Sequence, residues 1–209
     1  MTAVKIYTRK GDDGTTGLWY GGRRPKSDAR IDAYGELDEA GSALGVARSL
    51  CDLDVDDQAE IAGDVLWIQR ELFVAGAELA AAPEAYERLE DGVSRVTAAM
   101  VADLEPIIDR YMDRVELPPK FVIAGGTQLS AHLDLARAII RRAERRVAAL
   151  SLAGQLASDF VLQYLNRAAD LVYALARFSD RDDPALFEGR GQNAEQRTIE
   201  SDPEQEESR

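Results

Sequence analysis

Apolar residues recur at intervals of three and four along most of the chain, which is the spacing of one face of an α-helix. In the first such stretch Ile31, Leu37 and Leu44 share a face, and Asp28 stands before them as a candidate N-cap. The same periodicity returns four more times before the chain ends. It predicts helices over residues 28–50, 57–81, 94–115, 129–152 and 158–179.

The third predicted helix contains Pro106, which lacks a backbone donor and crowds the preceding turn. We therefore expect this helix to kink or to restart near the proline. Long amphipathic segments with short connections are typical of an antiparallel bundle. The predicted fold class is all-α, a five-helix antiparallel bundle in the up-and-down arrangement of ferritin-like proteins.

The two ends of the chain lack this periodicity. The first 27 residues contain five glycines and predict a loop, after a short extended piece at residues 4–8. Residues 183–209 are acidic and, from Asn193 onward, almost free of apolar side chains, which predicts a disordered tail. The chain thus divides into a loop at 1–27, a helical domain at 28–182 and a tail at 183–209.

The stretch from Thr8 to Gly17 reads Thr-Arg-Lys-Gly-Asp-Asp-Gly-Thr-Thr-Gly, and Lys26 follows shortly after. Glycines let the backbone turn, while hydroxyls, amides and cations gathered in one loop suit a polyphosphate. The stretch is not a Walker A motif, because no Lys and Ser or Thr follow Gly17. It is not a dinucleotide fingerprint either, because no βαβ unit surrounds it. An ordinary turn is the alternative interpretation of the loop alone.

Net charge narrows the choice of ligand. The chain of 209 residues has a net charge of −13, and only four of its 25 basic residues are lysines, which argues against non-specific binding to nucleic acid or anionic membrane. Such a surface is typical of a protein from a salt-rich source, although an ordinary acidic protein has the same balance. No stretch of about 18 apolar residues and no signal-peptide pattern occurs, so we expect a soluble, cytoplasmic protein. Cys51 is the only cysteine, which excludes an internal disulfide and a cysteine-rich zinc site.

The fourth predicted helix concentrates positive charge on one face. Arg137, Arg141 and Arg145 follow one another at four-residue spacing, with Glu144 on the same face and Arg142 beside it. Guanidinium groups bind phosphate oxygens in pairs and stay charged at every relevant pH, so this face suits a triphosphate. The alternative is a solvated face balanced by acidic neighbours.

Polar residues also interrupt apolar helix positions. Asn166 lies between two apolar runs and needs a partner, which a nucleotide or another helix would supply. Glu36, Asp38 and Glu39 stand among apolar positions of the first helix, where a bundle or subunit interface demands a cation. His132 is the only histidine, and no nucleophile elbow or Glu-x-x-His motif accompanies it. We therefore expect no metal site built from protein ligands, and His132 at the surface or an interface.

These features stand in the order found in one known family. The motifs are Tyr7-Thr8-Arg9-Lys10-Gly11-Asp12-Asp13-Gly14-Thr15-Thr16-Gly17, Lys26, Asp38-Glu39, Gly125-Gly126, Arg141-Arg142-Ala143-Glu144-Arg145 and Asn166-Arg167. The chain resembles the PduO-type ATP:cob(I)alamin adenosyltransferases, also called corrinoid adenosyltransferases, from about Lys5 to Arg177. The resemblance implies a homotrimer of five-helix bundles that binds ATP between neighbouring subunits, under an ordered glycine-rich loop.

By this resemblance the ligands are ATP with Mg²⁺ and a reduced corrinoid such as cob(I)alamin. The residues implied to bind ATP are Thr8, Arg9, Lys10, Gly11, Asp12, Gly14, Thr15, Thr16, Lys26, Arg141, Arg142, Glu144, Arg145 and Asn166. Asp38 and Arg137 match a salt bridge across the subunit interface. Phe121 matches an aromatic residue that packs beside the corrin and keeps the lower axial position of cobalt empty. The residues implied to take part in catalysis are Arg141, Phe121, Asp38 and Arg137.

The chain departs from the family pattern at a few positions. Ala124 stands where the family usually has proline, and Asp134 where it commonly has histidine, both on the corrinoid side. The match is therefore closer for the ATP site than for the corrinoid site. Ala168 and Ala169 replace leucine and serine in the motif that begins with Asn166, which changes only the packing between its polar residues.

The implied reaction is attack of Co(I) on the 5′ carbon of ATP, which expels triphosphate and forms a cobalt-carbon bond. The nucleophile belongs to the corrinoid, so the protein needs only to orient ATP and to neutralise the departing charge. Phe121 is implied to favour four-coordinate Co(II) and so to ease its reduction. A cobalamin reductase and an adenosylcobalamin-dependent enzyme are the expected partners. The alternatives are a non-catalytic module that binds ATP or corrinoid to deliver or sense the cofactor, and a purely structural bundle.

Overall fold

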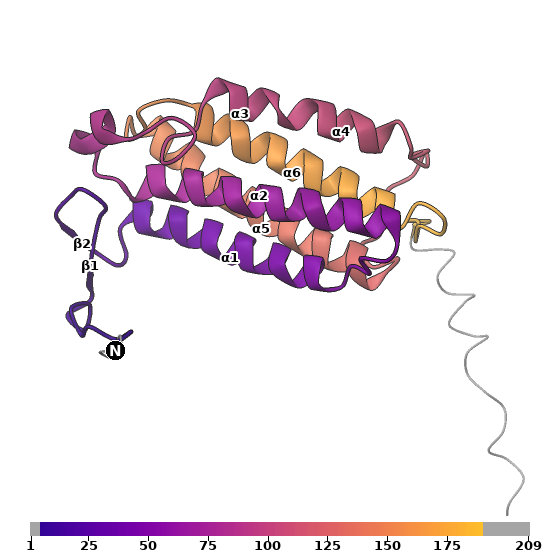
Figure 1. Cartoon of the computed structure of the whole chain (residues 1–209), viewed down its shortest axis with the longest axis horizontal. Coiled ribbons are helices and arrows are strands. Elements are labelled where there is room, and N and C mark those ends of the chain that lie inside the picture. The colour runs from indigo at the N-terminus through magenta and orange to yellow at the C-terminus, as the bar shows by residue number, and fades with distance from the viewer. Residues whose placement is uncertain (1–4, 190–209) are drawn as a thin grey trace, which may run out of the picture.

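The computed structural model describes residues 5–189, so most of the predicted tail lies outside the described residues. This part of the chain forms six α-helices, a 3₁₀ helix η1 and a two-stranded antiparallel sheet. The elements are β1 (Thr15–Gly17), β2 (Arg23–Pro25), α1 (Ala29–Ser49), α2 (Asp56–Ala80), η1 (Pro83–Arg88), α3 (Ala98–Ala102), α4 (Leu104–Met112), α5 (Gln128–Leu152) and α6 (Phe160–Ser179). The prediction of a mostly helical protein is confirmed (Figure 1).

The four long helices begin and end within two residues of their predicted bounds. Their starts follow from capping residues in the sequence. The Asp28 side chain accepts a hydrogen bond from the Arg30 backbone N–H at 2.9 Å, as an N-cap does. At the start of α5, Thr127 and Ser130 bond each other's backbone N–H groups and form a capping box.

The third predicted helix is two helices, α3 and α4, separated at Asp103. Pro106 is the third residue of α4, and in the first turn of a helix its missing N–H would have no partner in any case. Of the two outcomes expected near Pro106, a restart is therefore confirmed. The restart comes two residues before the proline, at Leu104.

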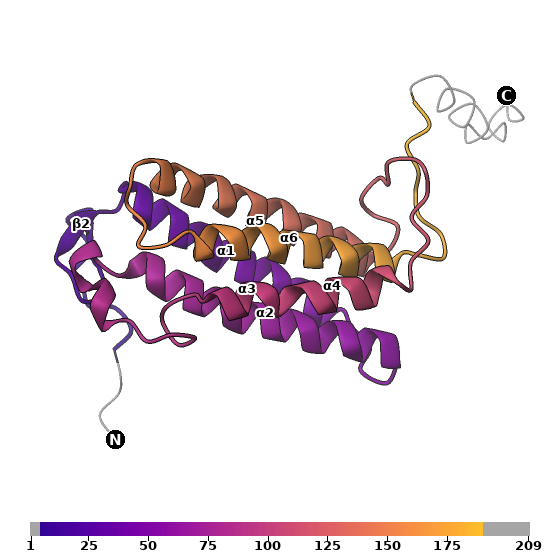
Figure 2. The same cartoon turned by 90° about the horizontal axis from the view of Figure 1, so that it is seen from above.

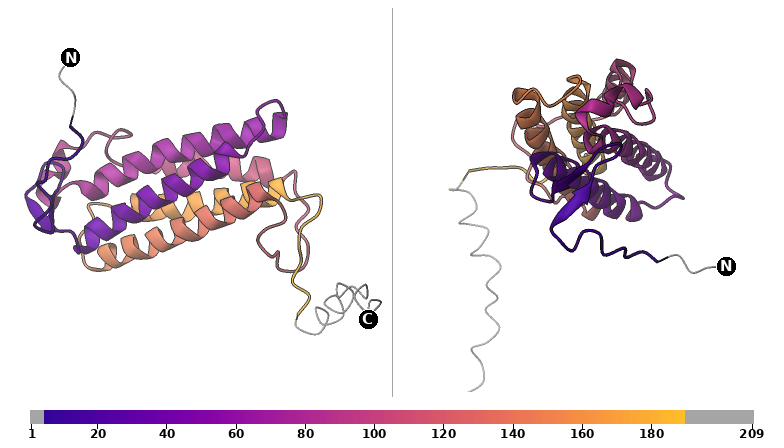
Figure 3. Two further views of the ribbon diagram at one scale, coloured as in Figure 1. Left: turned by 90° about the horizontal axis from the view of Figure 1, so that it is seen from below. Right: turned by 90° about the vertical axis from the view of Figure 1, so that its left-hand side faces the viewer.

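The helices α1, α2, α5 and α6 lie side by side along a common axis, and α3 and α4 follow one another along α6 (Figure 2). In the end-on view of Figure 3 they surround a shared core. Fully buried alanines such as Ala40, Ala143 and Ala168 let the helix backbones approach closely. Large side chains such as Leu165 and Phe178 fill the remaining space.

Because α1 and α5 run in opposite directions, the start of α1 and the end of α5 lie at the same end of the bundle. Arg30, at the start of α1, donates Nη2–H to the carbonyl oxygen of Gln155, just beyond the end of α5, at 2.5 Å. We call this the loop end, because residues 5–27 lie there. The opposite end carries the start of α5, the end of α6 and residues 117–127, and we call it the Phe121 end.

The sequence did not predict the two-stranded sheet or the backbone pairing of the last described residues. Residues 5–8 belong to no strand; β1 and β2 form a short hairpin further along the loop. At the Phe121 end, Ile123 N–H donates to the Ala185 carbonyl oxygen at 2.7 Å and Phe187 N–H to the Phe121 carbonyl oxygen at 2.8 Å. The first residues of the predicted tail therefore pair with residues 121–123. Within the described residues, no helix is long and apolar enough to cross a membrane.

Candidate functional site

The N-terminal loop is organised around Arg23 of β2. Arg23 donates Nε–H to the Thr15 hydroxyl at 2.8 Å, and its Nη2 lies 3.4 Å from the Asp13 carboxylate. The same nitrogen donates to the Lys10 carbonyl oxygen, so three residues of the loop converge on one guanidinium. Hydrogen bonds from the Thr15 hydroxyl and backbone N–H to Asp13 lower the pKa of that exposed carboxyl. Sequence reasoning missed Arg23, although it follows directly after two glycines.

The predicted phosphate-binding residues of the loop lie close together. Lys26 N–H donates to the Gly14 carbonyl oxygen at 2.9 Å, and Gly14 has the positive φ of 79° that glycine adopts without strain. A Cβ atom at Gly11 would lie 3.3 Å from the Lys26 ammonium, so that cation sits directly over Gly11. These contacts bring Gly11 and Gly14 to Lys26. The loop residues predicted to bind phosphate are Thr8, Arg9, Lys10, Gly11, Asp12, Gly14, Thr15, Thr16 and Lys26, most of them exposed.

The base of the loop is attached to the end of α2. Trp19 N–H donates to the Ala80 carbonyl oxygen at 2.8 Å, and Ala82 N–H donates back to the Trp19 carbonyl oxygen at 3.3 Å. The Arg88 guanidinium lies 4.1 Å from the centre of the Tyr20 ring, which adds a cation–π contact. The loop therefore has a fixed base and an exposed tip.

The arginines of α5 divide into two groups. Arg142 pairs with Glu36 at 2.5 Å and with Glu39, so it holds α5 against α1. Arg141 and Arg145 are exposed, and within the described residues neither has a carboxylate in salt-bridge distance. Arg145 Nη1 donates only to the Arg141 carbonyl oxygen, at 3.0 Å. Arg141 and Arg145 thus remain available to bind an anion. Arg142 is the cation that the acidic residues of α1 were expected to need.

Asn166 finds the partners that its apolar surroundings require. Its Nδ2–H donates to Glu144 of α5 at 3.1 Å, and its Oδ1 accepts from Arg167 at 2.9 Å. Arg167 in turn bonds Glu105 of α4 at 3.1 Å. The polar row links three helices beside the Arg141 face, and a nucleotide reaching it would meet groups that already have protein partners.

One chain does not bring its loop to its own α5 arginines. Arg141 stands in the middle of α5, about 15 Å of helix away from the loop end. Among the described residues no hydrogen bond or ion pair joins residues 8–17 to α5. Figure 1 shows β1 and β2 projecting beyond the end of the bundle. The predicted ATP residues therefore form two separate groups in a single chain.

Asp38 and Arg137 do not pair with each other within the chain. Asp38 is exposed on α1. The Arg137 Nε is buried and makes no hydrogen bond among the described residues, with the Asp134 carboxylate 3.6 Å away and the Tyr173 ring centre 5.4 Å from its guanidinium carbon. Asp38 thus has no ion-pair partner among the described residues, and Arg137 has only Asp134 of its own helix.

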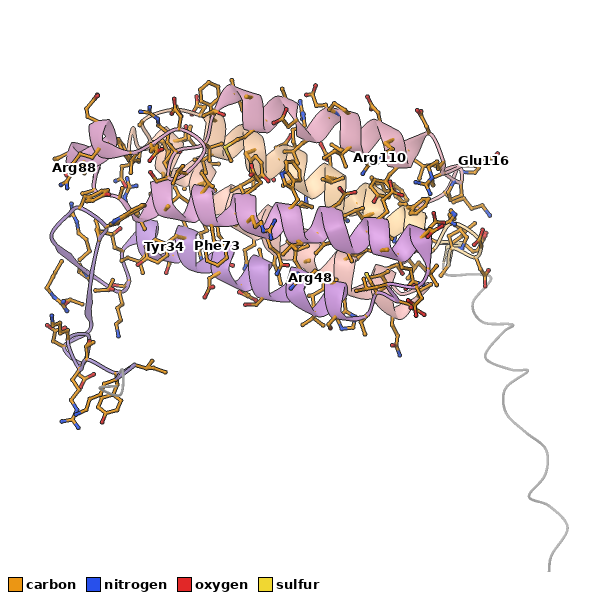
Figure 4. The ribbon with its side chains drawn as sticks, viewed as in Figure 1. Tyr34, Arg48, Phe73, Arg88, Arg110 and Glu116 are labelled. Atoms are coloured by element: carbon orange, nitrogen blue, oxygen red, sulfur yellow. The ribbon has the colours of Figure 1, made fainter. Side chains whose placement is uncertain are left out.

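An open apolar groove of about 500 Å³ runs between α1 and α2 on the outside of the bundle. Tyr34 and Phe73 line it from the two helices (Figure 4), and Phe73 is 79% exposed. Asp38 stands in its wall. Sequence reasoning missed this groove, although Gly41 and Gly45 at four-residue spacing leave a gap on one face of α1.

Phe121 stands at the far end of the bundle with 83% of its surface exposed. Its segment then passes through Gly125, with a φ of 115°, into α5. His132 lies nearby on α5, where its Nδ1 is 2.8 Å from the Gln128 carbonyl oxygen of its own helix. In the described part of the chain no three His, Cys, Asp or Glu side chains cluster as metal ligands would.

Comparison with known proteins gives a consistent result. A family model described as cobalamin adenosyltransferase matches residues 6–179. The chain is 39% identical over 175 residues to the corrinoid adenosyltransferase of Bacillus subtilis, covering 83% of this chain and 86% of the relative. It is 38% identical over 189 residues to that of Mycobacterium tuberculosis, covering 90% and 95%.

Solved structures of similar fold come from Lactobacillus reuteri. A phenylalanine-to-alanine variant of its PduO-type ATP:corrinoid adenosyltransferase, complexed with cobalamin and ATP, superposes with a TM-score of 0.79 at 33% identity, covering 88% of this chain and 100% of that one. An arginine-to-lysine variant complexed with ATP has a TM-score of 0.76 at 33% identity, covering 89% and 100%.

Proposed function

The chain belongs to the cobalamin adenosyltransferase family, and we infer that it transfers the 5′-deoxyadenosyl group of ATP to the Co(I) of a reduced corrinoid, releasing triphosphate. ATP and the corrinoid are its two substrates. The observation that carries this function is the extent of the family match, residues 6–179, which includes the loop, the arginines of α5 and Phe121. The active domain is assigned to residues 28–182 together with the loop at 1–27.

The loop and α5 are assigned to the triphosphate. Lys26, Arg141 and Arg145 are cations without a carboxylate partner among the described residues, so they are free to neutralise the charge that grows on the leaving group. Asn166 and Glu144 are assigned to the same site, with Arg142 keeping α5 in register with α1. Mg²⁺ is assigned to the phosphates of ATP, because Mg²⁺ usually keeps several waters and is bound through substrate phosphates rather than by a cage of protein ligands.

A homotrimer with ATP at each interface accounts for three observations at once. The loop lies away from the α5 arginines of its own chain, so a neighbour's arginines are the natural partners for it. Asp38 and Arg137 lack each other within the chain but would pair between chains. The apolar groove between α1 and α2 offers surface for a second copy. An interface between two different faces of the same chain closes into a ring of three when each neighbour is rotated by a third of a turn, and the five-helix bundle, with α3 and α4 as one interrupted helix, is the proposed unit.

Phe121 is assigned to the corrinoid. An exposed phenylalanine on a short attached segment is suited to pack beside the corrin ring, where it would exclude water and a lower ligand from cobalt. The reaction consumes Co(I), so a cobalamin reductase must supply electrons and an adenosylcobalamin-dependent enzyme must use the product. We place this chemistry in the cytoplasm.

An anaerobic assay with the purified chain, cob(I)alamin, ATP and Mg²⁺ tests the function. The visible spectrum should change to that of adenosylcobalamin, and triphosphate should accumulate in equal amount. Tight binding of both substrates without conversion would favour a module that delivers or senses the cofactor. Release of ADP or AMP would place the chemistry at phosphorus and contradict the proposal.

A further inference from the structure

Three charged side chains are buried together beneath the start of α5. Arg177, Asp134 and Asp180 are 3%, 8% and 3% exposed. Arg177 Nη2 donates to Asp134 at 2.7 Å and to Asp180 at 2.9 Å, and its Nε donates to Asp180 at 3.2 Å. Burial raises the pKa of Asp180 even though the Arg177 guanidinium opposes that rise. A buried cluster of this kind persists only where its geometry is well satisfied.

Asp180 supports the residues that precede α5. A Cβ atom at Gly126 would lie 3.0 Å from the Asp180 Cβ and 3.3 Å from its Oδ2, so the backbone at Gly126 rests on this side chain. Asp180 therefore fixes where the segment before α5 joins the helix.

Asp180 is also close in sequence to the residues that hold the other end of the segment before α5. Asp180 is the C-cap residue of α6, and Asp183 N–H donates to its carbonyl oxygen at 3.3 Å. The chain then continues to Ala185 and Phe187, which bond the backbone of residues 121–123. Residues 120–127 are thus held at one end by the Asp180 side chain and at the other by the chain that follows it.

We propose that Arg177 and Asp180 are positioning residues that hold residues 120–127, and with them Phe121, in the place required on the corrinoid side. Neither residue touches Phe121, so they act through Gly126 and residues 185–187. The proposal rests on the proposed function, in which Phe121 faces the corrin. It predicts that loosening this support harms the corrinoid step and leaves ATP binding intact.

The tests are Gly126→Ala, which forces a Cβ against Asp180, and Asp180→Asn, which keeps the shape and removes the charge. The controls are Gly63→Ala, where nothing lies within 4 Å, and Asp183→Asn, an exposed carboxylate of the same segment. Both test variants should raise KM for the corrinoid about tenfold or more and weaken the spectrum of four-coordinate Co(II). The dissociation constant of ATP should stay at the wild-type value.

Arg177 is tested by a conservative and a disruptive change. Arg177→Lys should keep part of the four-coordinate Co(II) signal because it keeps a cation, whereas Arg177→Met should lose it because Asp180 then stays buried without a cation and Asp134 keeps only Arg137, 3.6 Å away. Wild-type corrinoid KM and spectrum in Gly126→Ala and Asp180→Asn would overturn the proposal, as would an equal loss of ATP affinity.

Hydrogen–deuterium exchange separates this inference from the proposed function. Without any substrate, residues 120–127 should exchange faster in Gly126→Ala and Asp180→Asn than in the wild type and the two controls. If exchange changes in this way but the wild type makes no adenosylcobalamin, the function is wrong and the support of the segment stands. If exchange is unchanged while the wild type is active, the support by Asp180 is wrong.

Discussion

Gly21 lies so close to Ala82 that a Cβ atom added at Gly21 would come within 2.4 Å of the Ala82 Cβ. Real Cβ atoms do not approach each other to this distance, so only glycine fits here without a shift of the backbone. The contact joins the base of the N-terminal loop to the chain that leaves α2. The position of the loop therefore depends on a residue just over sixty positions away in the sequence.

Gly21→Ala should displace the loop and weaken ATP binding about tenfold, because the phosphate-binding residues would move with its base. Gly22→Ala is the matched control, since a Cβ at Gly22 meets nothing within 4 Å. Calorimetric titration with a non-reacting ATP analogue measures both. Equal affinities in the two variants would show that the loop does not depend on this contact.

Arg141→Ala should lower kcat/KM about a hundredfold, because it removes a cation from the leaving triphosphate. Arg146→Ala provides the control, being an exposed arginine of the same helix with no assigned role. Steady-state assays at saturating corrinoid measure the effect. If the two variants lose activity to the same extent, general loss of positive charge explains the result and the assignment of Arg141 is wrong.

Phe121→Ala should impair formation of four-coordinate Co(II) and leave the dissociation constant of ATP nearly unchanged. The side chain is 83% exposed, so its removal costs the fold little. Leu152→Ala removes a comparably exposed apolar side chain at the other end of α5 and should leave the cobalt spectrum as it is. A fall in ATP affinity without a spectral change would contradict the corrinoid role.

Asp38→Arg should break the trimer, because it would set two cations against each other where Asp38 is proposed to meet Arg137 of a neighbour. Asp32→Arg makes the same change at another exposed position of α1 and should leave the assembly intact. Size-exclusion chromatography with light scattering reports the mass of each species. A monomeric wild type, or a trimeric Asp38→Arg variant, would rule out this interface.

Glu78 gives a prediction on stability and pH. It is 2% exposed, its carboxylate accepts the Val96 N–H at 2.7 Å, and burial raises its pKa above the usual 4.5. Above pH 4.5 the unfolded chain releases this proton while the folded chain still holds it, so the free energy of unfolding falls as pH rises through that window. Glu78→Gln removes this cost and keeps an acceptor for Val96.

Thermal unfolding between about pH 4 and pH 7 measures the effect. The melting temperature of Glu78→Gln relative to wild type should increase as the pH rises. Glu84→Gln, a change at an exposed glutamate of η1, should show no such trend. A constant difference across the range would mean that Glu78 has the same pKa in both states.

The long helices could be predicted because their causes are local. Asp28 caps α1 through its own neighbours, and Pro106 lies in the first turn of α4, where its missing N–H costs no helix hydrogen bond. The polar position Asn166 was correctly predicted to need partners, because the cost of an unpaired buried amide depends on its surroundings alone. Which groups met that need was not predictable.

The remaining features depend on contacts between distant parts of the chain. Arg142, which was predicted to bind ATP, also pairs with Glu36 and Glu39, and this contact depends on the register of α5 on α1. The hairpin of β1 and β2 is too short to show the alternation of apolar and polar residues that predicts a strand. The hydrogen bond from Arg23 to Thr15 holds the two strands together, and no sequence pattern reveals that contact. The periodicity of the sequence does not reveal these contacts, because they form only when the helices have packed.

The separation of the N-terminal loop from the arginines of its own α5 has a genetic consequence. If each active site takes its loop from one chain and its arginines from another, a chain with a damaged loop and a chain with a damaged α5 are defective in different halves of the site. Rings that mix the two would contain some sites in which both halves are sound. A cell that carries one gene copy with Gly21→Ala and another with Arg141→Ala would then make adenosylcobalamin faster than a cell that carries either variant alone.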